Sequence, residues 1–263
     1  MDRALRLLEE GENVVSFRDS VDMLSLEDRQ LFQLDSVACQ FLDVARLKDV
    51  KFLESLLPFL PKSVLSSYVT SFIYDRQVQH AQAVLLDNFD ADDILGLALL
   101  DACDAGLQEL VQWMCERLPR TDVVAHRSLC QLVIRACEGG HLDVLLYLDG
   151  RYGITADIME GYESRLFTAA CQHKGPSTLD LLDWLKEKQL MTVELYQDMP
   201  HLYFIPMHDE RVYVMRWLDQ LYKLPFHTLF SHIKEFYFDV SCVPYDVQRY
   251  LRDSYPALFF SSL

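Results

Sequence analysis

The chain repeats one pattern along most of its length, and this periodicity limits the folds it can adopt. A large side chain, usually followed by Leu or Met, recurs at intervals of 32, 29, 34, 37, 33 and 33 residues. Cys103, Cys137 and Cys171 lie 34 residues apart, as do Gly106 and Gly140. Agreement between independent markers on one period predicts an array of stacked structural repeats. The large side chains are Phe52, Val84, Trp113, Tyr147, Trp184, Trp217 and Tyr250.

Residues 129–150 show the content of one repeat. A helical segment ends near Ala136, a turn follows at Gly139 and Gly140, and leucines recur at three- and four-residue spacing from Leu142. We expect Gly140 to adopt the left-handed conformation that ends a helix. Two such short helices cannot bury their apolar faces against each other alone, so each pair needs neighbouring copies.

The spacing between repeats is irregular at one place, where residues 174–178 lengthen the turn between the two helices. Ser177 or Thr178 is expected to cap the helix that follows. Short loops are expected between repeats, including one at residues 150–153. No alternating strand pattern is present. The sequence therefore predicts an all-α helical-repeat solenoid of about seven helix-turn-helix units over residues 39–263, with residues 1–38 as an N-terminal helical cap.

Residues 136–148 resemble a known repeat. Their sequence, Ala-Cys-Glu-Gly-Gly-His-Leu-Asp-Val-Leu-Leu-Tyr-Leu, is similar to the ankyrin-repeat core A-A-x-x-G-H-L-E-V-V-x-x-L. Residues 101–111 match more loosely, and the resemblance is best over residues 98–153. The T-P-L-H tetrapeptide of that family is missing from every unit. The chain is thus identified as a divergent ankyrin-repeat protein whose outer units are expected to be plain helical hairpins.

The ankyrin resemblance implies a protein-protein interaction scaffold or adaptor, which binds its partner through inter-repeat loops and the concave face. It implies no catalytic residue, no cofactor and no metal. Degenerate arrays of this kind are also similar to those of effectors of intracellular pathogens, which would place the chain in a host cytosol.

Charge and cysteine usage restrict the partner and the compartment. The formal net charge is −16, which disfavours nucleic acid and anionic membranes and favours a protein partner with a basic surface. The seven cysteines form no C-x-x-C pair, and no apolar run has the length of a membrane span. We therefore expect a soluble cytoplasmic protein without membrane insertion.

Two patterns resemble chemical sites. Cys171, His173 and Asp180 are the residue types of a cysteine hydrolase, but the Cys-x-His spacing on a helix points the two side chains apart. The acidic stretch 87–93 lacks the central glycine and the final glutamate of a calcium loop. A small buried residue and a helix N-terminus are the simpler interpretations. A cysteine-dependent hydrolase with a dispersed site remains the alternative function, and a helical-repeat nucleic-acid reader a second one.

Partner-binding residues are expected where an aromatic or charged side chain lies in a loop without an evident packing role. The aromatic residues 255–263 remain open as another docking end. The predicted binding residues are Phe89, Asp90, Asp92, Arg120, Arg127, Arg151 and Tyr152.

Overall fold

The fold is all-α. The computed structural model describes residues 38–39, 42–43, 45, 47, 50–57, 60–87, 92–117, 126–194, 201–237 and 242–260, and within these ranges it contains helices and no strand. The all-α part of the predicted fold class is confirmed, while the predicted cap at 1–38 lies almost wholly outside the described residues. The helices are α5 (Val50–Leu56), α6 (Lys62–Tyr74), α7 (Val78–Asp87), α8 (Asp92–Asp104), α9 (Gln108–Arg117), α11 (His126–Gly139), α12 (Leu142–Tyr152), α13 (Glu163–Gln172), α14 (Thr178–Glu187), α16 (His201–His208), α17 (Val212–Leu221), α18 (Phe226–Tyr237), α19 (Tyr245–Ser254) and α20 (Ala257–Phe260).

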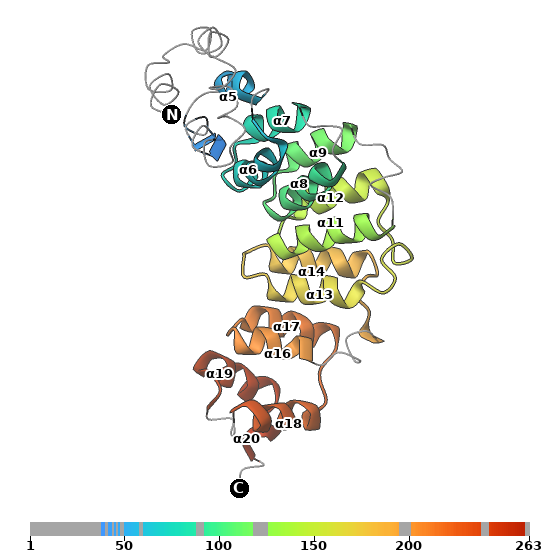
Figure 1. Cartoon of the computed structure of the whole chain (residues 1–263). Helices are drawn as coiled ribbons and strands as arrows, with labels where there is room; N and C mark the ends of the chain where they lie inside the picture. The colour runs from blue at the N-terminus through green and yellow to red at the C-terminus, as the bar shows by residue number, and fades with distance from the viewer. Residues whose placement is uncertain are drawn as a thin grey trace. The chain divides into compact units, whose positions relative to one another are not determined.

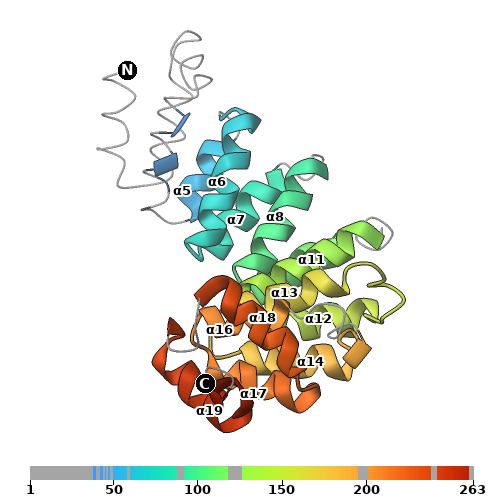
Figure 2. The same ribbon diagram turned by 90° about the horizontal axis from the view of Figure 1, so that it is seen from below.

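The helices pack sequentially within two compact units, residues 1–120 and 121–263. In the first unit α6 contacts α7 and α8, α8 contacts α9, and α5 contacts α7. In the second unit α11, α13 and α16 form one row and α14, α17 and α19 another, and each helix of the first row also packs on its successor in the chain (Figures 1 and 2). The last helix, α20, packs on α18 and α19.

The residues that follow the periodic large side chains lie in the core. The residue after each large side chain is at most 1% exposed in all seven cases. Burying one such side chain contributes about 1.5–3 kcal/mol. The sequence period therefore recurs as one buried residue in each of α5, α7, α9, α12, α14, α17 and α19. The buried residues are Leu53, Leu85, Met114, Leu148, Leu185, Leu218 and Leu251.

Helices α8 and α11 end in the predicted glycine turn. Gly106 and Gly140 have φ values of 68° and 80°, in the left-handed region. The amide of Gly140 donates to Cys137 O at 3.2 Å, and the amide of His141 donates to Ala136 O at 2.9 Å. This pair of bonds defines a Schellman motif, which satisfies carbonyls that a helix end leaves without partners.

Helices α6 and α16 end in the same turn without glycine. Arg76 and Glu210 have φ values of 60° and 59°. The amide of Gln77 donates to Phe72 O at 2.8 Å, and that of Arg211 to Pro206 O at 2.7 Å. A left-handed residue other than glycine costs about 1–2 kcal/mol, which the packing of these turns must offset.

Helix α13 ends differently, at the lengthened turn. Its C-cap, His173, is extended, with φ −61° and ψ 127°. The hydroxyl of Ser177 donates to Gly140 O at 2.8 Å and that of Thr178 donates to His173 O at 2.8 Å. The predicted capping of α14 by Ser177 or Thr178 is therefore wrong, because these hydroxyls donate to the carbonyls of Gly140 and His173 and accept nothing from the amides of α14.

Arg211, which belongs to the next helix pair, donates hydrogen bonds to the last carbonyls of α13. Arg211 lies in the turn between α16 and α17 and is 7% exposed, and its guanidinium donates to His173 O at 2.6 Å and to Cys171 O. It also contacts Asp209 at 3.2 Å. A cation at a helix C-terminus is favourable because the last carbonyls carry partial negative charge.

The sequence prediction of a loose loop at 150–153 is wrong. Helix α12 continues to Tyr152, and Gly153 is its left-handed C-cap, with φ 69°. Its amide donates to Asp149 O at 2.7 Å. The glycine, which permits the left-handed conformation, therefore marks the end of the helix rather than an irregular connection.

A histidine pair between α16 and α18 makes stability depend on pH. Nε2 of His232 lies 3.2 Å from Nε2 of His208, and the His232 ring stacks on Phe204. Burial, with a smaller contribution from His208, lowers the pKa of His232 to about 4. The unfolded chain, with an ordinary pKa near 6.5, binds this proton first as the pH falls, so stability decreases between about pH 6.5 and 4.

The change to test is His232→Gln. Because the ring is partly exposed, we expect the wild type to lose only about 1–2 kcal/mol more than this variant from pH 7 to pH 5. Urea unfolding at the two pH values measures the difference. Equal losses in both proteins would show that His232 does not titrate with an altered pKa.

Candidate functional site

The structure describes the side chains of two of the seven predicted binding residues, Arg151 and Tyr152. Phe89, Asp90 and Arg120 lie outside the described residues, and Asp92 and Arg127 lie in the first turns of α8 and α11 with side chains that are not described. Arg151 and Tyr152 were expected in a loop but form the last turn of α12. Arg151 Nε donates to Tyr152 Oη at 3.3 Å, so among the described side chains of this set these two are brought together.

The cysteines expected at the repeat positions are buried and protonated. Burial raises the pKa of the thiols of Cys103, Cys137 and Cys171 well above the ordinary range. The positive charge of Arg211 opposes this only in part for Cys171. Since the thiolate is the nucleophile, these thiols are poor candidates for covalent chemistry. No group of three or more metal-ligating side chains occurs in the part of the chain that the structure describes.

Thiol accessibility tests this arrangement directly. In the folded protein we expect Cys242, which is exposed, to react with a thiol reagent quickly, and Cys103, Cys137 and Cys171 to react only on unfolding. The measurement is a timed thiol titration in buffer and in denaturant. Cys242→Ser should remove the fast phase, and rapid labelling of Cys171 in the folded protein would revive the hydrolase alternative.

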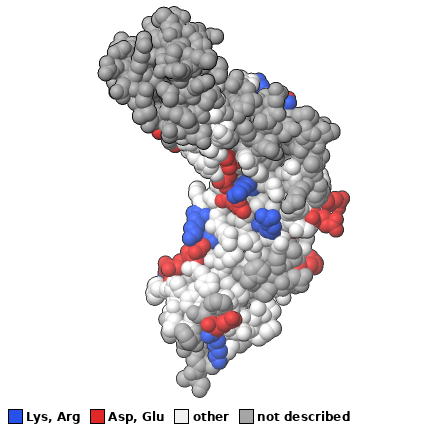
Figure 3. Space-filling model, in the orientation of Figure 1, with Lys and Arg blue, Asp and Glu red and all other residues white. Residues whose placement is uncertain are grey.

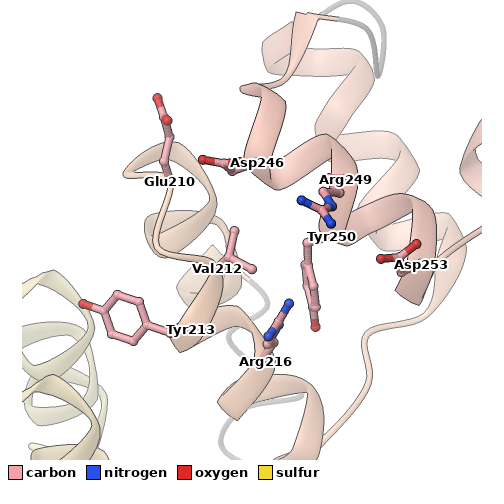
Figure 4. A pocket seen from close by; sticks show the side chains of 8 residues that line it. All are labelled: Glu210, Val212, Tyr213, Arg216, Asp246, Arg249, Tyr250 and Asp253. Carbon is pink, nitrogen blue, oxygen red and sulfur yellow. The ribbon is translucent and has the colours of Figure 1, made fainter.

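A charged groove lies between α17 and α19 of the second unit. Its volume is about 500 Å³, and Figure 4 shows its lining side chains. Residues i, i+3, i+4 and i+7 of α19 form one wall, because these positions share a helix face. The lining residues are Glu210, Val212, Tyr213, Arg216, Asp246, Arg249, Tyr250 and Asp253.

The two arginines of the groove are separated in space from two of its three carboxylates, and the third, Asp253, lies on the side of the arginines (Figure 4). Arg216 and Arg249 flank the Tyr250 ring, and the Arg216 guanidinium lies 5.6 Å from its centroid (Figure 4). Glu210 and Asp246 lie near each other at one end. Within the described residues, none of these four charged groups forms an ion pair. The groove therefore presents hydrogen-bonding capacity of both signs to a ligand.

Tyr250 is held in place by a partly buried carboxylate. Its hydroxyl donates to Oδ2 of Asp219 on α17, and the hydroxyls of Tyr255 and Tyr203 donate to the same carboxylate at 2.6 and 3.3 Å. Burial raises the pKa of Asp219, while the three hydroxyls lower it. This network joins α16, α17 and α19, so it fixes the two walls of the groove and the ring between the arginines.

Sequence reasoning missed this groove, although the repeat contains a signal for it. Arg216 and Arg249 each precede the large marker residue of their repeat, and they lie 33 residues apart. In two repeats the position before the marker contacts the next marker along the row. Arg216 lies over Tyr250, and Asp183 accepts a hydrogen bond from Trp217 Nε1 at 2.7 Å. At this position of the repeat, Asp183 and Arg216 thus lie between neighbouring helices of the row α14, α17 and α19.

Comparison with protein-family models, curated proteins and solved structures finds no match for the chain. In the described part of the chain, no helix is long and apolar enough to cross a membrane. On the face drawn in Figure 3, acidic and basic side chains occur in small groups separated by uncharged surface. The groove and the repeated helix pairs are therefore the features of this chain that indicate a function.

Proposed function

We propose that the chain is a protein-interaction scaffold and that the groove between α17 and α19 is a partner-binding site. The observation that carries this proposal is the set of charged side chains that line the groove without ion pairs among the described residues. Arginine and tyrosine dominate interface energetics, and here Arg216, Arg249 and Tyr250 lie together on fixed helices.

The scaffold is, in this proposal, an ankyrin-like array of about seven helix pairs. The buried marker residues recur with the sequence period, and the turns after α6, α8, α11 and α16 share one hydrogen-bonding pattern. In a repeat array the buried positions maintain stacking, while surface positions are free to vary with the partner. The free, mostly buried cysteines support a reducing, cytosolic compartment.

Affinity capture followed by binding measurements with purified proteins tests the proposal. We expect Arg216→Ala with Arg249→Ala to weaken binding of a captured partner by about tenfold or more, because arginine contacts at interface centres are worth more than about 1 kcal/mol each. Arg135→Ala with Arg165→Ala is the matched control, since both are exposed arginines on first-row helices α11 and α13. The control should change affinity by less than about twofold.

Two results would count against the proposal. Failure of the wild-type chain to bind any captured protein again when both are purified would contradict the scaffold function. Equal affinity of the groove variant and the control would retain the scaffold but move the site elsewhere, with Arg151 and Tyr152 as the next pair to change.

A further inference from the structure

We propose, on the basis of the interaction function above, that the groove binds an extended segment of a partner protein in which an acidic side chain lies close to a basic one. The acidic side chain is held between Arg216 and Arg249. The basic side chain pairs with Glu210 and Asp246 at the neighbouring end.

The two arginines define the carboxylate position. Their guanidinium groups flank one ring (Figure 4), and the Arg216 group lies 5.6 Å from its centroid. Each guanidinium offers a planar fork of donors, which suits bidentate bonding to a carboxylate. The ring is itself fixed, because its hydroxyl is bonded to Asp219, so the space between the arginines is organised before binding.

The acidic end defines the second position. Glu210 is the left-handed residue of the turn before α17, and Asp246 lies in the first turn of α19. Both therefore stand at the same end of the helix pair, as Figure 4 shows. A lysine or arginine of the ligand would bond to both carboxylates, in agreement with the basic partner that the charge of −16 favours.

The dimensions favour a peptide segment over a folded surface or a nucleic acid. A volume of about 500 Å³ lies in the range that holds a drug-sized ligand, which corresponds to a few residues. Glu210, Asp246 and Asp253 line the same groove as the arginines, and these three carboxylates would repel a run of phosphates. The mixed signs thus fit a segment that itself carries both charges.

Peptide selection on the full chain tests the inference. A phage library of short random peptides is selected on the wild type, with counter-selection on Arg216→Gln with Arg249→Gln. We expect the enriched sequences to share an acidic residue with a basic residue close by. Circular dichroism melts must first show that the variants are as stable as the wild type.

Synthetic peptides then provide a double-mutant cycle. Replacing the acidic residue of an enriched peptide by Gln should weaken binding to the wild type by about tenfold, and should have no further effect on the double arginine variant. Replacing the basic residue should show the same dependence on Glu210→Gln with Asp246→Asn. The two cycles together assign each charge of the peptide to one end of the groove.

Several outcomes would overturn the inference. These are no enrichment, enrichment without a charge requirement, or losses that simply add in the two cycles. Displacement of the peptide by inorganic phosphate, but not by chloride at equal ionic strength, would assign the arginines to a phosphorylated segment instead. If these tests fail while the arginine variant still loses a captured protein partner, the scaffold function stands and only the peptide occupant is wrong.

Discussion

Arg211→Met is expected to lower the free energy of unfolding by about 2–4 kcal/mol. In the wild type the buried guanidinium of Arg211 donates hydrogen bonds to Cys171 O, His173 O and the Asp209 carboxylate. Met occupies a comparable volume but donates no hydrogen bond. Cys171 O therefore loses its donor, while His173 O keeps only the Thr178 hydroxyl and Asp209 keeps only the exposed Lys174. A buried polar group left without a partner costs about 1–3 kcal/mol, and this accounts for most of the loss.

The loss of stability should be large because the end of α13 depends on Arg211, whereas other helices in the row satisfy their last carbonyls without such a side chain. Helices α6, α8, α11 and α16 satisfy their last carbonyls through their own turns. Helix α13 has the lengthened turn instead, with His173 in an extended conformation. Its end therefore depends on a donor from the next helix pair, and Arg211 is that donor.

Urea unfolding followed by circular dichroism measures the effect. Arg165→Met is the matched control, because Arg165 is exposed on α13 itself and should change stability by less than about 0.5 kcal/mol. Arg211→Lys should recover only part of the loss, since one ammonium cannot reproduce the fork that reaches two carbonyls. If Arg211→Met is as stable as the control, the guanidinium does not cap α13.

The helical architecture could be predicted because buried residues recur at similar intervals along the chain. Leu148 and Leu185 follow aromatic side chains, Cys137 and Cys171 occupy one repeated position, and all four are fully buried. Gly140 could be assigned to a left-handed turn because no other residue adopts that conformation as readily. Hydrophobic burial and glycine chemistry are local properties, so the sequence displays both.

Other features depend on contacts between repeats, which one sequence does not display. Arg76 and Glu210 adopt left-handed conformations, although neither residue type predicts that conformation. Ser177 was expected to cap α14, but the nearby carbonyl of Gly140 takes its hydrogen bond. The groove was missed for the same reason, since Arg216 and Asp246 belong to different repeats and line one groove only when α17 and α19 pack together.

Gly140→Ala is expected to lower the free energy of unfolding by about 2–4 kcal/mol, and Gly153→Ala by about 1–2 kcal/mol. Both glycines are left-handed, with φ values of 80° and 69°, so both substitutions incur the same backbone strain. A Cβ at Gly153 meets nothing within 4 Å, whereas one at Gly140 would lie 2.1 Å from Cε1 of His173. The additional loss at Gly140 is therefore the displacement of this imidazole from its close-packed position.

A His173→Ala background separates the two causes. Without the imidazole, Gly140→Ala should cost no more than Gly153→Ala, because only the backbone strain remains. Urea unfolding of the single and double variants gives the coupling between the two positions directly. If Gly140→Ala has the same effect with and without the imidazole, the turn after α11 and the turn after α13 do not pack on each other as the structure shows. A coupling of about 1 kcal/mol or more would establish that the inserted turn packs on its neighbour through His173.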